Sequence, residues 1–274
     1  MVGGTGKTPM CIALAKLLQA QGKKPFFLTR GYGGSLKNVY VDPARHTAAQ
    51  VGDEPLELAA VAPTIVASDR KHGAKLAEQR GARIIIMDDG LQNPSLVKTK
   101  SLLVFDAVYG LGNGRLFPAG PMREPLAEAV ARAQLAVLNG SSTDTAWLEN
   151  SLKPYKIPVL KAQFKLDEEV VANLAGKKVM AFAGLGRPEK FFASLKNEKV
   201  NVVRTVKFPD HYDYSADEFS RMLAESLSAG LILCTTVKDA AKLPPDLRDK
   251  IMAVPGALVF EDPSLLAAFL KGIV

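Results

Sequence analysis

The chain lacks long apolar runs and has few of the residues that build disulfide or metal frameworks. No stretch of its 274 residues approaches the ~20 consecutive apolar residues that a membrane-spanning helix needs. Only two cysteines occur, Cys11 and Cys234, and both lie inside apolar runs. This placement favours buried free thiols in a reducing compartment over a disulfide or a metal site. Met1 leads straight into a glycine-rich segment without a signal peptide, so we expect an intracellular chain.

The charge balance is basic, although the basic residues form no recognisable nucleic-acid motif. Lys and Arg together number 35 against 28 Asp and Glu, which gives a formal net charge of +7. An excess of this sign suits an anionic surface such as phospholipid head groups or nucleic acid. The basic residues are scattered, and we find no zinc-finger, RNA-binding or basic-zipper pattern. We therefore expect no nucleic-acid partner, and the excess indicates either contact with an anionic membrane or an ordinary solvated surface.

Short apolar runs alternate with helical patterns along most of the chain. This rhythm is typical of an α/β fold with a mostly parallel sheet, in which buried strands are apolar on both faces. A capping box, Ser215 with Glu218, predicts the start of a helix that continues to about 228. The strand candidates, all rich in apolar residues, are 25–29, 64–67, 83–87, 101–105, 134–138, 179–183 and 231–235.

The N-terminal segment has the composition of a phosphate-binding loop followed by a helix. The apolar residues that follow the spacing of one helix face are Met10, Ala13, Leu14, Leu17 and Leu18. Glycines let successive backbone N–H groups surround phosphate oxygens, and a helix N-terminus adds partial positive charge. The segment matches the second half of a Walker A loop, and an incidental glycine turn is the alternative. In such a loop Lys7 would neutralise the β- and γ-phosphates of ATP, and the Thr8 hydroxyl would ligate Mg²⁺. The residues that we expect to bind the nucleotide are Gly3, Gly4, Thr5, Gly6, Lys7 and Thr8.

Acidic residues follow one of the predicted buried strands. The apolar run at 84–87 ends in Asp88 and Asp89, and a carboxylate at this place in a P-loop protein holds Mg²⁺ or its water shell. A turn or a helix cap is the alternative for this pair. The Gly- and Pro-rich segment at 110–125 contains Glu124 and is too long for a simple connector, which indicates an active-site loop.

Two further polar positions say little by themselves. Asp53 belongs to the short acidic segment 52–55, for which a solvated turn is the default interpretation. His211 lies in a loop ahead of the capped helix, where a structural or solvated histidine is more common than a catalytic one.

The composition changes near 141–158, a polar stretch that contains proline. We take this stretch as the approach to a second unit. The prediction is a P-loop NTPase-like kinase core over residues 1–155 and a smaller α/β domain over residues 156–274, which would close over an active-site cleft.

The motifs occur in an order that is similar to one particular family. The motif segments are GGTGKTP at 3–9, TRGYGG at 29–34, GDEP at 52–55, DDGLQ at 88–92, GNG at 112–114, PAGPMREP at 118–125, FAGLG at 182–186, FPDH at 208–211 and TTVKD at 235–239. This set resembles the tetraacyldisaccharide 4′-kinases, the lipid A 4′-kinases of Gram-negative bacteria, over nearly the whole chain. The TRGYGG, GDEP and PAGP segments are more specific than the phosphate loop.

The resemblance implies transfer of the ATP γ-phosphate to the 4′-hydroxyl of tetraacyldisaccharide 1-phosphate. It also implies a two-lobed α/β enzyme that meets this lipid at the cytoplasmic face of the inner membrane. Lys7 then has a catalytic role in the phosphate loop, Asp53 resembles the family's catalytic base, and His211 its partner. The groups implied around Mg²⁺ are Thr8, Asp88, Asp89 and Glu124.

The sequence departs from the family pattern in two places. Family members usually carry an apolar anchor helix and a strand before the loop, and we expect this part to be encoded upstream of Met1. Asn93 stands where histidine often follows the DDGLQ motif, so we assign it no proton transfer. The alternatives are a P-loop kinase for another acceptor and an N-terminally truncated, non-catalytic nucleotide-binding remnant.

Overall fold

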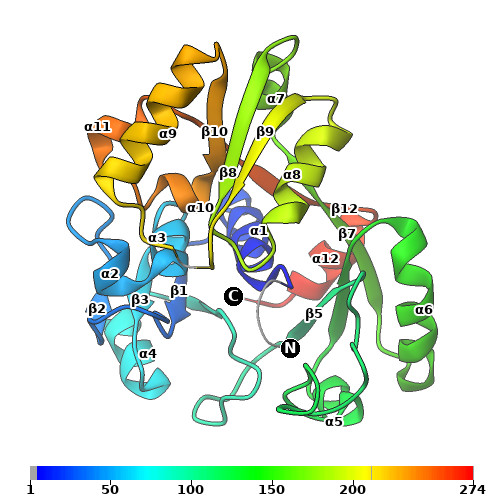
Figure 1. Cartoon of the computed structure of the whole chain (residues 1–274). Coiled ribbons are helices and arrows are strands. Elements are labelled where there is room, and N and C mark those ends of the chain that lie inside the picture. The colour runs from blue at the N-terminus through cyan, green and yellow to red at the C-terminus, as the bar shows by residue number, and fades with distance from the viewer. Residues whose placement is uncertain (1–4, 211, 274) are drawn as a thin grey trace.

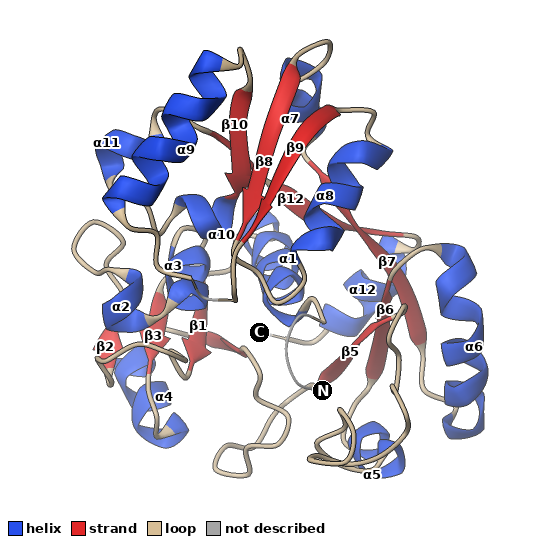
Figure 2. Ribbon diagram, in the orientation of Figure 1, coloured by secondary structure: helices blue, strands red, loops and turns tan. Residues whose placement is uncertain are grey.

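The computed structural model describes residues 5–210 and 212–273, in which helices alternate with the strands of three four-stranded sheets (Figures 1 and 2). The strands are β1 (Pro25–Thr29), β2 (Val39–Tyr40), β3 (Thr64–Val66), β4 (Ile84–Met87), β5 (Leu102–Asp106), β6 (Leu135–Asn139), β7 (Val159–Leu166), β8 (Lys178–Ala183), β9 (Asn201–Lys207), β10 (Ile232–Thr236), β11 (Met252–Val254) and β12 (Gly256–Phe260). The helices are α1 (Lys7–Ala20), α2 (Ala48–Val51), α3 (Asp53–Ala59), α4 (Arg70–Gln79), α5 (Leu126–Ala131), α6 (Ser142–Leu152), η1 (Lys153–Tyr155), α7 (Glu168–Asn173), α8 (Pro188–Asn197), α9 (Ala216–Ser228), α10 (Val237–Ala240), α11 (Pro245–Arg248) and α12 (Pro263–Leu270).

The first sheet has the strand order β2-β3-β1-β4. Strand β1 pairs in parallel with β3 and with β4, and all five of its residues are buried. Because successive side chains of a strand point to opposite faces, Leu28 packs with Ala77 of α4, while Phe27 packs with Leu58 of α3. The loops after β1, β3 and β4 therefore begin at one edge of the sheet, where a parallel α/β sheet forms its binding sites.

The second sheet has the order β12-β7-β6-β5 and is parallel except for β12. Residues 141–158, expected to lead toward a second unit, form α6 and η1. Leu148 and Leu152 of α6 pack under β6. Strand β7 continues the same sheet, and β12 returns to it from near the end of the chain. Segments from both sides of the predicted boundary between residues 155 and 156 build this sheet. The division into domains over residues 1–155 and 156–274 stays a prediction.

The third sheet, with the order β11-β10-β8-β9, is parallel throughout and lies at the top of Figure 1. Alternate residues of β8 face two helices: Ala181 packs with Phe191 of α8, and Phe182 packs with Phe219 of α9. The capping box at the start of α9 is present as predicted, because the Ser215 hydroxyl accepts from the Glu218 N–H and the Glu218 carboxylate accepts from Ser215.

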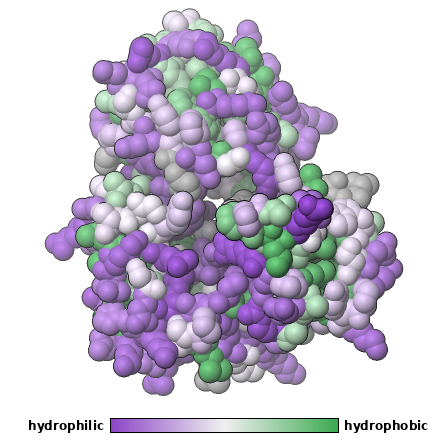
Figure 3. All heavy atoms as spheres, turned by 60° about the horizontal axis from the view of Figure 1, so that its bottom comes forward, coloured by the Kyte–Doolittle hydropathy of each residue, from purple (hydrophilic) through white to green (hydrophobic). Residues whose placement is uncertain are grey.

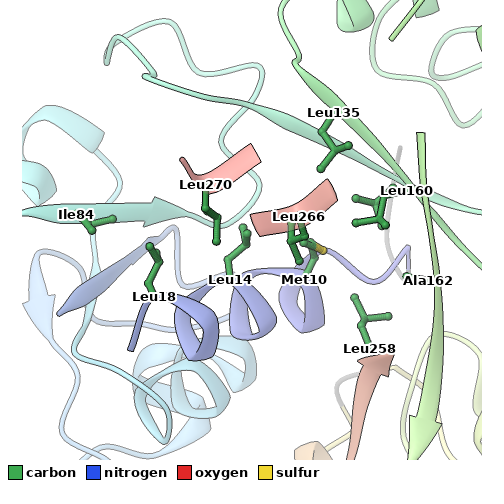
Figure 4. Close-up of a cluster of buried hydrophobic side chains, with 11 residues drawn as sticks. Met10, Leu14, Leu18, Ile84, Leu135, Leu160, Ala162, Leu258, Leu266 and Leu270 are labelled. Atoms are coloured by element: carbon green, nitrogen blue, oxygen red, sulfur yellow. The ribbon is translucent and has the colours of Figure 1, made fainter. Parts of the chain in front are cut away.

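Helices α1 and α12 join the first sheet to the second (Figure 4). Met10, Leu14 and Leu18 of α1 form one buried cluster with Ile84 of β4 and with apolar residues of the second sheet. Leu266 and Leu270 of α12 belong to the same cluster. Truncating a leucine in such a core costs about 2–5 kcal/mol. The position of α1, and with it the phosphate loop, is therefore fixed by the core that unites the two sheets.

The strand and helix predictions agree closely with the structure. All seven predicted strands are present with boundaries within one residue, and α1 has its predicted apolar face. Cys11 and Cys234 are buried free thiols, as expected. Within the described residues, the structure contains no helix of the length and hydropathy needed to cross a bilayer.

Candidate active site

The phosphate loop is described from Thr5 onward and ends at the N-terminus of α1. Gly6 precedes the helix in a left-handed conformation (φ +93°), and a Cβ there would lie 2.6 Å from Nδ2 of Asn139. No described side chain caps this helix end, which leaves N–H groups of its first turn for an anion. The buried Thr5 Oγ1 has no hydrogen-bond partner among the described residues. Gly3 and Gly4, the other predicted loop residues, lie outside the described part of the chain.

Lys7 and Thr8 each lie against one of the carboxylates that follow β4. The Thr8 hydroxyl donates to Oδ2 of Asp88 at 2.9 Å, and Nζ of Lys7 lies 3.8 Å from Oδ1 of Asp89. The buried Arg70 of α4 fixes the backbone of the same turn by donating to the Asp88 carbonyl at 3.4 Å. The structure thus brings together four of the residues that the sequence predicted for nucleotide and metal.

The two neighbouring carboxylates differ in electrostatic environment. Burial raises the pKa of Asp88, and the charges of Asp89 and Glu54 act in the same direction, against the Thr8 hydrogen bond and the charge of Lys7. Burial also acts to raise the pKa of Asp89, but Lys7 and Arg123 outweigh it, and the pKa is lowered. An added cation would therefore stabilise the ionised form of Asp88 more than that of Asp89, because Lys7 and Arg123 already lie beside Asp89.

The loop at 110–125 closes against this turn. Nη1 of Arg123 donates to Oδ2 of Asp89 at 2.7 Å. Glu124 accepts from Nε2 of Gln92 at 2.6 Å and also forms an ion pair with Arg132. The predicted loop therefore reaches the site. Gln92 and Arg132 hold the Glu124 carboxylate, and its assignment to the metal stays a prediction.

Asp53 and Glu54 begin α3 and face two lysines of the segment 178–254, which forms the third sheet and its helices and is called the third-sheet unit below. Nζ of Lys242 lies 3.3 Å from Oδ2 of Asp53, and Nζ of Lys238 lies 2.9 Å from Oε1 of Glu54 and 3.8 Å from Oδ2 of Asp53. Gly52, the residue before α3, has a φ of +95°, and a Cβ there would lie 2.6 Å from the Tyr32 carbonyl oxygen, so the start of α3 requires glycine at this position. Neither lysine was predicted from the sequence. Lys238 belongs to the TTVKD motif at 235–239, and Lys242 lies outside every motif segment.

Glu57, one turn after Asp53 and Glu54, is a further carboxyl group that the sequence did not single out. Burial raises its pKa to about 7, and Lys238 opposes this rise. The like charges of Glu54, Asp88 and Asp53 add to it. His211, the predicted partner of Asp53, lies outside the described residues.

The donor set fits a nucleotide that carries its own cation. Among the described residues no group of three or more His, Cys, Asp or Glu side chains is arranged to hold a metal by itself. Mg²⁺ needs few protein ligands, since it keeps waters and takes phosphate oxygens. The Thr8 hydroxyl beside the Asp88 carboxylate offers hard oxygen ligands, and the N-terminus of α1, which no described side chain caps, offers backbone N–H groups to phosphate.

A glycine turn at a helix N-terminus, followed by a lysine and by a threonine bonded to a strand-terminal aspartate, defines a P-loop nucleotide-binding protein. The model of the family described as Tetraacyldisaccharide-1-P 4'-kinase matches residues 1–274. The chain therefore belongs to the tetraacyldisaccharide-1-P 4'-kinase family.

Individual relatives agree with this placement. The chain is 44% identical over 273 residues to the tetraacyldisaccharide 4'-kinase of Rhodopseudomonas palustris (strain BisB5), covering 98% of this chain and 81% of the relative. It is 48% identical over 267 residues to that of Paramagnetospirillum magneticum, covering 97% and 81%. The crystal structure of LpxK from Aquifex aeolicus in complex with ATP superposes with a TM-score of 0.75 at 27% identity, covering 99% of this chain and 85% of that one. The predicted family and the predicted P-loop α/β fold class are thus confirmed.

Proposed function

We infer that this chain is an ATP-dependent kinase that phosphorylates the 4′-hydroxyl of tetraacyldisaccharide 1-phosphate in lipid A biosynthesis. The observation that carries this conclusion is the pairing of Thr8 with Asp88 and of Lys7 with Asp89 at the N-terminus of α1. This is the arrangement that a P-loop kinase needs, and it occurs in a chain that belongs to the family of this name.

The phosphate loop and its carboxylates would hold Mg-ATP. N–H groups at the start of α1 would bind phosphate oxygens, and Lys7 would neutralise charge on the β- and γ-phosphates. Thr8, with Asp88 and Asp89, would hold Mg²⁺ or its waters, and when bound the cation supplies charge neutralisation between the β- and γ-phosphates. Most of the rate enhancement of such a reaction comes from positioning and charge stabilisation.

Asp53 would accept the proton of the sugar hydroxyl. A hydroxyl is a weak nucleophile, and a correctly placed carboxylate base contributes about 10²–10⁴-fold. Asp53 lies at the start of α3, which packs through Leu58 against Cys11 and Ala15 of α1, the helix that follows the phosphate loop. Lys238 and Lys242 of the third-sheet unit lie within 4 Å of its carboxylate. His211 would orient Asp53 from that unit.

We also propose that this chain contacts the anionic inner face of the inner membrane, where the lipid acceptor resides. The net charge of +7 supports it. So do the exposed Val108, Tyr109, Leu116 and Phe117 around the start of the 110–125 loop. On the face shown in Figure 3 hydrophilic atoms predominate, with hydrophobic atoms gathered in patches. Sedimentation with anionic and with neutral vesicles tests this contact, and equal binding to both would contradict it.

The activity is tested with γ-labelled ATP, Mg²⁺ and detergent-dispersed tetraacyldisaccharide 1-phosphate. The product is analysed by mass spectrometry for one added phosphate group and by NMR for its position. We expect label on the 4′-oxygen and strict dependence on Mg²⁺. A soluble sugar acceptor that outcompetes the lipid would support a kinase for another acceptor. ATP binding without transfer to any acceptor would support a non-catalytic nucleotide-binding protein.

A further inference from the structure

We propose that Lys242 is a positioning residue for the phosphoryl transfer, because its ammonium group connects the proposed base Asp53 to the rigid third sheet. This inference rests on the proposed function. It concerns a residue that is distant from the phosphate loop in the sequence and that, in this proposal, would touch neither ATP nor the acceptor.

Lys242 is among the least exposed charged side chains of the site. Its side chain is only 4% exposed, and Nζ lies between two carboxylates, 3.3 Å from Oδ2 of Asp53 and 3.1 Å from Oδ1 of Asp239. The Asp53 side chain is 9% exposed and that of Asp239 is fully buried. A cation held at hydrogen-bonding distance between two buried carboxylates has little freedom, and so it restricts both of them.

Asp239 is itself anchored to the third sheet by neutral donors. Its Oδ2 accepts from the Gly184 N–H at 3.1 Å and from the Thr236 hydroxyl at 2.9 Å. Gly184 follows β8, and Thr236 ends β10, so the two central strands of the sheet hold this carboxylate. A connected series of polar contacts therefore runs from the backbone after β8 through Asp239 and Lys242 to Asp53.

Lys238 does not duplicate this role. It is 16% exposed, its close partner is Glu54 at 2.9 Å, and it lies 3.8 Å from Oδ2 of Asp53. Of the two lysines, Lys242 therefore lies closer to Asp53, and it also pairs with Asp239. These contacts indicate that Lys242 holds Oδ2 of Asp53, so that the carboxylate presents its other oxygen in one orientation.

A second ion-pair cluster, which joins the second sheet to the third-sheet unit, provides a control. The buried Asp106, at the end of β5, pairs with Arg187 at 2.8 Å and with Lys190 of α8. Lys190 also belongs to the third-sheet unit and also pairs with a buried carboxylate, but that carboxylate is Asp106 and not the proposed base. The same substitution at Lys190 therefore removes an ion pair between the units without disturbing the proposed base.

The test compares Lys242→Met, Lys242→Arg and Lys190→Met in the complete chain, with steady-state kinetics on Mg-ATP and the lipid acceptor. We expect Lys242→Met to lower kcat about 10–100-fold, since small displacements of a catalytic group cost about this much. KM for ATP should stay within about twofold, and Lys242→Arg should restore most of kcat. Lys190→Met should retain kcat within about threefold. A wild-type kcat in Lys242→Met, or an equal loss in Lys190→Met, would overturn the proposal.

A second variant covers the case in which Lys242→Met does not fold. Lys242→Gln keeps hydrogen-bond donors for both carboxylates but removes the charge, and thermal unfolding would establish that it is folded. It should also lose kcat, and wild-type turnover in folded Lys242→Gln would contradict the proposal. Failure of the proposed function is distinguishable, because the wild-type chain would then transfer no phosphate to the lipid while still binding ATP.

Discussion

Ionisation of Glu57 should make this protein less stable as the pH rises, and Glu57→Gln should remove that loss. Burial raises the pKa of Glu57 from its ordinary value of 4.5 to about 7 in the folded chain. The folded protein therefore holds this proton more tightly than the unfolded chain does. The free energy of unfolding falls as the pH increases from about 4.5 to about 7, and the loss is complete above that range.

The size of the effect follows from the interval between the two pKa values. At about 1.4 kcal/mol for each unit of pKa difference, the upper limit is about 3.5 kcal/mol. The Glu57 side chain is only partly buried, so solvent screening reduces the expected value. We expect Glu57→Gln to gain about 1–2 kcal/mol relative to wild type between about pH 5 and about pH 8.

Urea denaturation of both proteins at these two pH values measures the gain directly. Glu78→Gln provides the control, since Glu78 is an exposed glutamate on α4 and its replacement should have the same small effect at both values. A stability difference between Glu57→Gln and wild type that does not change with pH would refute the reasoning, because it would show that Glu57 ionises equally in the folded and unfolded chain.

Three further variants test the site and its surroundings. Gly6→Ala should weaken ATP binding by about tenfold or more in calorimetry, because alanine disfavours φ +93° and its Cβ would collide with Asn139. Thr8→Val should lower kcat/KM for Mg-ATP by about tenfold or more in the coupled kinase assay, since Asp88 loses its hydroxyl partner and Mg²⁺ a ligand. Asp106→Asn should lower the free energy of unfolding by about 1–3 kcal/mol, measured with urea, because two cations at the start of α8 lose their anion.

The sequence predicted the local elements well because their signals are local. The apolar run at β4 and the two aspartates after it placed one side of the site, and the spacing from Met10 to Leu18 predicted α1. The Gly-Lys-Thr segment identified the phosphate loop for the same reason, since glycine, lysine and threonine have distinct tasks at fixed positions.

What the sequence could not predict depends on contacts between distant segments. Nothing near residue 256 indicates that β12 returns to pair antiparallel with β7, because a short apolar strand fits several sheets. Lys242 is one of 35 basic residues, and only the fold shows that it is buried between Asp53 and Asp239. The raised pKa of Glu57 likewise comes from burial and from like charges, among them Asp88, which is distant in the sequence.

The central claim is that phosphate passes from the α1 loop to an acceptor whose proton is taken by Asp53. The most direct measurement is the single-turnover rate of 4′-phosphate formation by Asp53→Asn, with saturating Mg-ATP and lipid acceptor. The predicted result is a rate about 10²–10⁴-fold below wild type with unchanged affinity for ATP. A rate equal to that of wild type would contradict the claim.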